Sequence, residues 1–115
     1  MKKLLYSPNY TDKIRILKHY LDTRFGPWVR KQIIRDIGTQ VRALRENENL
    51  GYSVRDMYGV DTDCLCFFIR KNYVFYKVDK DSIYIINIYN EREDFMMNMF
   101  GIKTSSEESE EYWDY

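Results

Sequence analysis

The spacing of the apolar residues changes near Gly51, and this change constrains the fold more than any other feature of the chain. Before Gly51, apolar residues recur every three or four positions, which is the spacing of one face of an α-helix. After it, β-branched and aromatic residues gather in short runs between turn residues, which is typical of strands. A chain with helices first and strands afterwards is expected to fold as an α+β domain, with its helices on one sheet face.

The first helix has a clear predicted start. Residues 2–6 are expected to form a short strand, and Ser7-Pro8 has the pattern of an N-cap followed by proline at the first helical position. The helix is therefore predicted over about residues 8–24. Its apolar face consists of Tyr10, Ile14, Leu17 and Leu21.

A second helix is predicted after the break at Gly26-Pro27. Its apolar stripe consists of Val29, Ile33, Ile37, Val41 and Leu44. The polar residues 46–49, followed by Gly51, are expected to end it. Because the break between the two amphipathic helices is so short, we expect them to form an antiparallel pair.

Three strands are predicted after the helices, as an antiparallel meander. The runs 65–70 and 73–78 flank Lys71-Asn72, which is expected to form a tight hairpin turn. The third run, 83–89, carries apolar residues on both faces, which favours a central position in the sheet.

Two shorter elements frame this meander. Residues 52–58 are predicted to form a short edge strand that ends at Gly59, and residues 95–102 a short final helix or turn that Gly101 ends. The expected fold is thus an N-terminal strand, a helix pair, a three-stranded meander and a short C-terminal helix.

The chain has no net charge, but its charges are unevenly distributed. Residues 106–115 contain five of the 18 acidic residues and no base, so the rest of the chain holds all 18 Lys and Arg residues against 13 acids, a net charge of +5. We therefore expect one domain at 1–103 and an acidic, disordered tail at 104–115. The tail either only adds solubility, or folds back on the basic body or binds a partner.

Several kinds of protein are disfavoured by the sequence. No apolar run approaches the roughly 20 residues that span a bilayer, and the N-terminus lacks the apolar stretch of a signal peptide, so we expect a cytoplasmic protein. Cys64 and Cys66 are two apart, on one face of a strand, and His19 is the only histidine. We therefore expect small apolar strand residues rather than a metal site, and no cofactor.

Three stretches of the chain resemble the RelE/ParE superfamily, the toxins of type II toxin–antitoxin modules. The first is the helix pair of 8–46 followed by a glycine, and the second is the strand of 73–78 with its turn into the Ile-rich strand that follows. The third is 86–94, INIYNERED, which is similar to a strand end that is commonly I-L-H-x-R-x-D in the family. The resemblance covers about residues 1–102.

This resemblance implies a toxin that a cognate antitoxin wraps and silences in a hetero-oligomer. RelE-like members cut mRNA on the ribosome without a metal, whereas ParE-like members inhibit DNA gyrase. The resemblance leaves both targets open. It also leaves open a non-catalytic, non-toxic binding module that retains the fold.

The chain departs from the family pattern at two positions. The family's strand arginine falls at Tyr73, and its terminal histidine falls at Asn90, while Arg92 still matches. Tyrosine carries no permanent positive charge, and asparagine is not a base at neutral pH. These replacements reduce the weight of the nuclease hypothesis.

A nuclease without a metal needs positioned cations and acid–base groups. The catalytic candidates are Arg92, Tyr89, Arg70 and Lys77. The candidates for nucleic-acid contacts are Arg55, Arg70, Lys77 and Tyr73. Apart from Arg92, each of these side chains also has a simpler explanation, as a solvated strand cation or a half-buried packing tyrosine.

The residues around the final strand end carry two further hypotheses. Met96, Met99 and Phe100 are either core residues or an adaptable surface for an antitoxin helix. Asn90 and Glu93 have the spacing of a capping box and are expected to start the last helix.

Overall fold

The structure is a computed structural model in which residues 1–102 are described, and these residues form five strands and four helices. In chain order they are β1 (Lys3–Tyr6), α1 (Pro8–Phe25), α2 (Pro27–Ala43), β2 (Tyr52–Ser53), α3 (Val54–Tyr58), β3 (Leu65–Ile69), β4 (Asn72–Val78), β5 (Ser82–Asn90) and α4 (Phe95–Phe100). The sheet order is β1-β5-β4-β3-β2. Strand β1 runs parallel to β5, and the other neighbours are antiparallel. The predicted α+β fold is confirmed.

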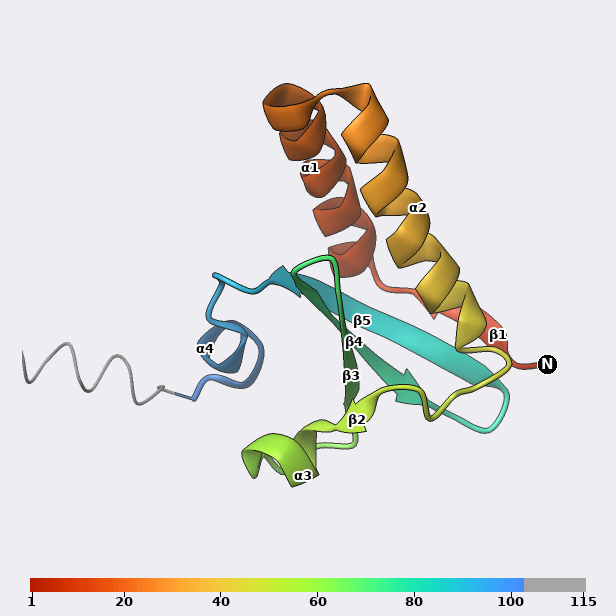
Figure 1. Ribbon diagram of the computed structural model, residues 1–115. Coiled ribbons are helices and arrows are strands. Elements are labelled where there is room, and N and C mark those ends of the chain that lie inside the picture. Colours follow the sequence, from red (N-terminus) through yellow and green to blue (C-terminus); the bar gives the residue numbers. More distant parts are fainter. Residues whose placement is uncertain (103–115) are drawn as a thin grey trace, which may run out of the picture.

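Helices α1 and α2 stand side by side above the sheet, while α3 and α4 lie on its other side (Figure 1). The predicted start of α1 is confirmed, because the Ser7 Oγ accepts a hydrogen bond of 2.9 Å from the Tyr10 N–H. Gly26 ends the helix with a φ of +93°, and Pro27 begins the next one. Glycine adopts such a φ without the steric cost of a Cβ. The antiparallel helix pair follows directly from this break.

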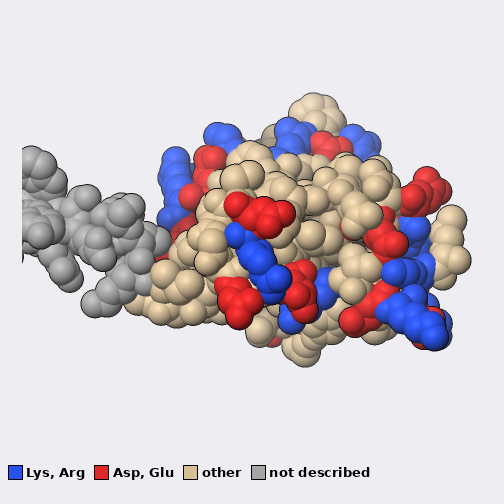
Figure 2. Space-filling view, turned by 90° about the horizontal axis from the view of Figure 1, so that it is seen from below, with Lys and Arg blue, Asp and Glu red and all other residues tan. Residues whose placement is uncertain are grey.

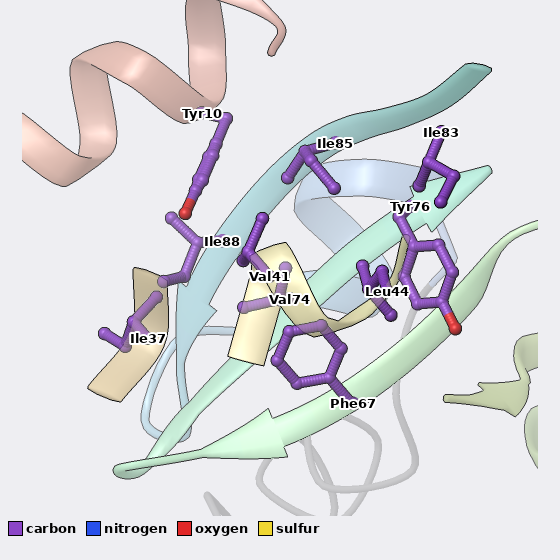
Figure 3. Close-up of a cluster of buried hydrophobic side chains, with 10 residues drawn as sticks. All are labelled: Tyr10, Ile37, Val41, Leu44, Phe67, Val74, Tyr76, Ile83, Ile85 and Ile88. Atoms are coloured by element: carbon purple, nitrogen blue, oxygen red, sulfur yellow. The ribbon is translucent and has the colours of Figure 1, made fainter. Parts of the chain in front are cut away.

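The main core lies between the helix pair and the sheet. Figure 3 shows its ten buried side chains, which come from both helices and from β3, β4 and β5. They are Tyr10, Ile37, Val41, Leu44, Phe67, Val74, Tyr76, Ile83, Ile85 and Ile88. Burial of this apolar surface is the main favourable term that holds the helix pair on the sheet.

A second core lies on the opposite face of the sheet. Its buried members are Val54, Val60, Cys64, Cys66, Phe75 and Tyr89. Helix α3 contributes to this cluster, and the residues of α4 pack against it. The two cysteines are free thiols that share this buried face, as predicted from their spacing. Because apolar layers cover both faces, β5 is apolar on both sides, and the structure confirms it as an interior strand.

An irregularity in the β4–β5 pairing sets which side chains of β5 face the helices. Phe75 pairs with Asn87 and Tyr76 pairs with Ile85, so one extra residue of β5 lies between these pairs. Such a bulge shifts the alternation of side chains. As a result both Ile85 and Ile88 enter the main core, although their separation in sequence is odd.

The structure corrects two predictions for the middle of the chain. Only Tyr52–Ser53 of the expected edge strand 52–58 is a strand, and Val54–Tyr58 is helical. The helix forms there because the Ser53 Oγ caps it, accepting from the Asp56 N–H at 3.2 Å, and Val54 is buried in the second core. The hairpin turn lies at Arg70-Lys71, one residue earlier than predicted, with φ values of 50° and 65°.

The last helix begins at Phe95 as predicted, but its predicted N-cap, Asn90, is wrong by four residues. The N-cap of α4 is Asp94, whose Oδ1 accepts from the Met97 N–H at 3.1 Å, and Gly101 ends the helix. Asn90 instead belongs to β5. The predicted acidic tail, 104–115, lies outside the described residues. None of the helices in residues 1–102 has the length and apolar character needed to cross a bilayer.

Candidate functional site

A cleft of about 650 Å³ opens between the tip of the helix pair and one end of the sheet. Its apolar wall comes mostly from α1 and α2, and includes Ile16, Leu17, Tyr20, Phe25, Val29 and Ile33. Its polar rim comes from Lys13, from the β3–β4 turn and from the segment that follows β5. The cleft exists because the helix pair extends past the end of the sheet (Figure 1).

Large apolar side chains stay exposed at this tip. The exposed fractions are 64% for Ile16, 51% for Tyr20, 57% for Phe25 and 70% for Trp28. Isolated exposed apolar residues are ordinary, but a group of them beside a cleft marks an interaction site. These residues were missed by the sequence predictions. The signal in the sequence was Ile16 and Tyr20, which are four apart and lie beside the core stripe of α1.

The segment 91–93 is anchored at the rim of the cleft. The Glu91 N–H donates to the Lys71 carbonyl at 2.8 Å. The Lys13 ammonium pairs with Glu93 Oε2 at 2.7 Å and lies 3.8 Å from the centre of the Tyr89 ring. These contacts hold the end of β5 against both α1 and the β3–β4 turn.

Arg92 stands on this anchored segment with its side chain exposed to solvent. No acidic side chain among residues 1–102 pairs with its guanidinium. The backbone N–H of Arg92 donates to Asn90 Oδ1 at 3.0 Å, which fixes the backbone from which the side chain projects. The backbone of Arg92 is therefore held in place, and its guanidinium is available to an anionic or polar ligand.

Arg70 reaches the same cleft, whereas Tyr89 does not line it and belongs to the second core. The Arg70 guanidinium already pairs with Asp36 Oδ2 at 2.9 Å. Tyr89 is buried, and its hydroxyl accepts from Asn87 Nδ2 at 3.0 Å. Burial, with a smaller contribution from the charge of Glu93, raises the pKa of Tyr89, so its hydroxyl is held neutral.

Lys77 and Arg55 lie away from the cleft. Lys77 pairs with Tyr84 near the far end of the β4–β5 ladder, whereas Asn72 pairs with Asn90 at the cleft end. Lys77 is five positions along β4 from Asn72, which is about 17 Å of strand. Arg55 belongs to α3 and pairs with Asp61 at 2.9 Å and Asp63 at 3.6 Å. On the face seen in Figure 2, basic side chains are interspersed with acidic ones.

The remaining candidates pack against the second core. Tyr73 is half-buried, with its ring 4.8 Å from that of Phe68 and 5.0 Å from that of Phe95, measured between centroids. Burial is the first cause that raises the pKa of Tyr73. Met96, Met99 and Phe100 are half-buried against the same cluster. They serve as packing residues, with part of each side chain still accessible.

Both cysteines are buried away from solvent. Burial raises the pKa of the Cys66 thiol to about 12, so the reactive thiolate is absent at neutral pH. Residues 1–102 contain no group of three or more His, Cys, Asp or Glu side chains that is arranged to hold a metal ion.

Comparisons with known proteins agree with the fold and the resemblance in the sequence. A family model described as "ParE toxin of type II toxin-antitoxin system, parDE" matches residues 4–95. A solved structure described as "Chromosomal ParDE TA system from P. aeruginosa" has a TM-score of 0.65 and 16% sequence identity, and the match covers 78% of this chain and 96% of that chain. At this identity the structural likeness concerns the fold alone. A search of curated protein sequences gives no match. Because the family model spans most of its length, the chain belongs to the ParE toxin family of type II toxin–antitoxin systems, within the RelE/ParE superfamily.

Proposed function

We propose that this chain inhibits growth by binding a protein target, DNA gyrase, through the cleft and Arg92, and that it does not cut RNA. The observation that carries the proposal is the combination of an exposed, unpaired arginine, within the described residues, with an apolar-walled cleft beside it. Arginine flanked by aromatic and aliphatic side chains is typical of residues that dominate protein–protein binding energy.

RNA cleavage is poorly supported by the same geometry. The reaction needs a base, a phosphate-binding cation and an acid within reach of one phosphate. Of the candidates, Lys77 lies about 17 Å of strand from the cleft. The Tyr89 hydroxyl is buried, and its neighbour Asn87 already donates to it. Asn90 cannot act as a base at neutral pH.

We also propose that a cognate antitoxin binds and silences the chain in a hetero-oligomer. Membership of the family supports such a partner. The accessible parts of Met96, Met99 and Phe100 on α4 remain our proposed contacts for it, because flexible thioether side chains adapt to a partner helix. The contact would extend the apolar layer that α4 already places on the second sheet face.

The test of the function is expression without an antitoxin, followed by two assays. One measures supercoiling by purified gyrase, and the other maps cuts in translated mRNA by primer extension. We expect loss of supercoiling with intact mRNA. The Arg92→Ala variant should need about tenfold more protein for the same inhibition, since loss of one such contact costs about 1.4 kcal/mol or more.

The matched control is Arg45→Ala, which removes an exposed arginine that does not line the cleft. It should inhibit gyrase as well as the parent does. Codon-linked cuts in mRNA that vanish in Arg92→Ala would instead establish the chain as a ribosome-dependent nuclease.

The second candidate is a non-toxic binding module that retains the fold. It is favoured by the replacement of two family positions by Tyr73 and Asn90. Strong expression that leaves growth, supercoiling and mRNA unchanged would support this candidate.

A further inference from the structure

The cleft and the C-terminal segment of the chain are complementary in charge and in apolar character. The cleft has four basic side chains, from Lys13, Arg70, Lys71 and Arg92, against two acidic ones, from Glu91 and Glu93. Residues 106–115 carry five acids and no base, and within this segment Tyr112, Trp113 and Tyr115 come after the four glutamates. We propose that residues 106–115 bind in this cleft of their own chain, with the glutamates against Arg92 and Lys71 and the aromatic rings against the apolar wall.

Two of the four cations are available for new ion pairs. Lys13 already pairs with Glu93, and Arg70 already pairs with Asp36. Lys71 and Arg92 have no ion pair within residues 1–102. They are neighbours in space, because the backbone of Glu91 is hydrogen-bonded to that of Lys71 at 2.8 Å. Together they form a basic pair that suits the Glu107–Glu111 cluster.

The order of residues in the segment matches the layout of the cleft. The basic pair lies at the sheet end, and the exposed apolar side chains Ile16, Tyr20 and Phe25 lie toward the helix tips. In the sequence the glutamates come first and the aromatic residues follow. A segment that enters from the sheet end therefore meets the cations with its glutamates and the apolar wall with its rings.

The length of the segment is sufficient for this path. Helix α4 starts two residues after Glu93, and its six residues carry the chain only about 9 Å along the helix axis. The five residues from Ile102 to Glu107 span up to about 17 Å when extended, enough to return to Arg92. The six residues from Glu107 to Trp113 then span up to about 20 Å, close to the length of about 18 Å between Lys13 and Phe25 along α1.

A second basic surface of the described residues fits this segment less well. The outer side of α2 carries exposed cations at Arg35 and Arg42, and Arg45 follows the helix. No large apolar side chain of α2 after Trp28 is exposed to receive the rings of Tyr112 and Trp113, so this surface offers only screened charge. Binding there would rest only on attraction between charges, which salt weakens, and would not shield the Trp113 ring from solvent.

The inference has a regulatory consequence, which rests on the proposed function. A segment bound over Arg92 covers the surface that we propose for the target. Replacing its glutamates should then make the toxin more potent. The binding itself can be measured on this chain alone, without an antitoxin or gyrase, so failure of one proposal is distinguishable from failure of the other.

The experiment is NMR spectroscopy of the ¹⁵N-labelled full chain and of a variant with Glu107, Glu108, Glu110 and Glu111 replaced by glutamine. We expect the amide signals of Lys71, Arg92 and Tyr20 to shift between the two proteins, and that of Lys77 to stay in place. The ¹⁵N–¹H nuclear Overhauser effect of the Trp113 indole should be positive in the parent. It should fall in the glutamine variant and in 0.5 M NaCl, where the Debye length is only about 4 Å.

Two charge-reversal variants decide where the segment binds. Arg92→Glu should release Trp113 as the glutamine variant does, whereas Arg45→Glu should leave it bound. Both changes are on exposed side chains, and a dispersed spectrum verifies that each variant is folded. An indole signal that is equally mobile in every protein, shifts on the outer side of α2, or shifts that grow with protein concentration would each overturn the proposal.

Discussion

Tyr76 connects the sheet to the loop that follows α2, and its hydroxyl offers a sharp test of how this connection is stabilised. The side chain is fully buried in the main core. Its hydroxyl donates to the Glu48 carbonyl at 2.9 Å and accepts from the Gly51 N–H at 2.8 Å. The contact is tight, because a Cβ on Gly51 would lie 2.8 Å from the hydroxyl oxygen and 2.6 Å from the Cys66 carbonyl.

The substitution Tyr76→Phe removes both hydrogen bonds and keeps the ring, so it creates almost no cavity. Each neutral hydrogen bond contributes about 0.5–1.5 kcal/mol net, and two backbone groups lose their partner. We therefore expect the free energy of unfolding to fall by about 1–3 kcal/mol. For a domain of about this size the midpoint of thermal unfolding falls by about 4–8 °C per kcal/mol.

The assay is urea denaturation followed by circular dichroism, with Tyr20→Phe as the matched control. The Tyr20 side chain is half exposed, at 51%, so loss of its hydroxyl should change the free energy of unfolding by less than about 0.5 kcal/mol. A Tyr76→Phe variant with an unchanged m-value and the stability of this control would refute the reasoning. The hydroxyl would then contribute nothing net to holding the loop on the sheet.

Two further predictions concern the last helix and the response to alkali. Asp94→Ala removes the N-cap of α4 and should destabilise this helix by about 1 kcal/mol. The Met97 amide should then exchange its hydrogen faster than in the parent. In the control Asp94→Asn, which keeps a capping oxygen, this amide should exchange at the parent's rate. Burial, helped by Tyr6, raises the pKa of Tyr10 to about 12 from 10.0. The contribution of Tyr10 to stability should therefore be constant below pH 10 and fall as the pH rises from 10 toward 12. Between pH 8 and pH 11 the urea midpoint of Tyr10→Phe should fall less than that of the parent. An equal fall in the two proteins would exclude Tyr10 as the cause.

The helix pair could be predicted from the sequence because its signals are local. Ser7 and Pro8 start α1 through bonds within one turn, and Gly26 ends it with a positive φ. The apolar stripes then orient both helices without knowledge of the sheet. The strands of the meander follow in the same way from their composition and turns.

Helix α3 was not predictable by the same means, since its stability depends on distant contacts. Residues 52–58 are too short for their periodicity to distinguish a strand from a helix. Whether these residues form a helix depends on Val54, which is buried in the second core with Cys66 of β3 and Phe75 of β4. Only the folded sheet supplies that environment.

The candidate site shows the same division between local and distant information. Lys77 and Arg70 both looked like strand cations in the sequence. In the structure Arg70 lies in the β3–β4 turn at the cleft, whereas the register of β4 and β5 puts Lys77 near the other end of the ladder. The bulge near Phe75 is a second feature that the sequence did not reveal, and it determines which side chains of β5 face each layer. The alternation of side chains along a single strand predicts neither the pairing register nor the position of a bulge.

In the charged segment 90–94, at the end of β5, some residues have structural contacts and one, Arg92, has a side chain that is free, among the described residues, to bind a target. Asn90 and Glu93 exchange hydrogen bonds across a turn, with the Asn90 carbonyl accepting from the Glu93 N–H at 2.9 Å and Glu93 Oε1 accepting from the Asn90 N–H at 3.4 Å. The Asn90 Oδ1 also accepts from the backbone N–H of Arg92 at 3.0 Å. Glu93 also pairs with Lys13, and Asp94 caps α4. The Arg92 side chain has no such structural bond within residues 1–102. Because its removal should leave the fold intact, a loss of toxicity in Arg92→Ala would report binding to the target rather than unfolding.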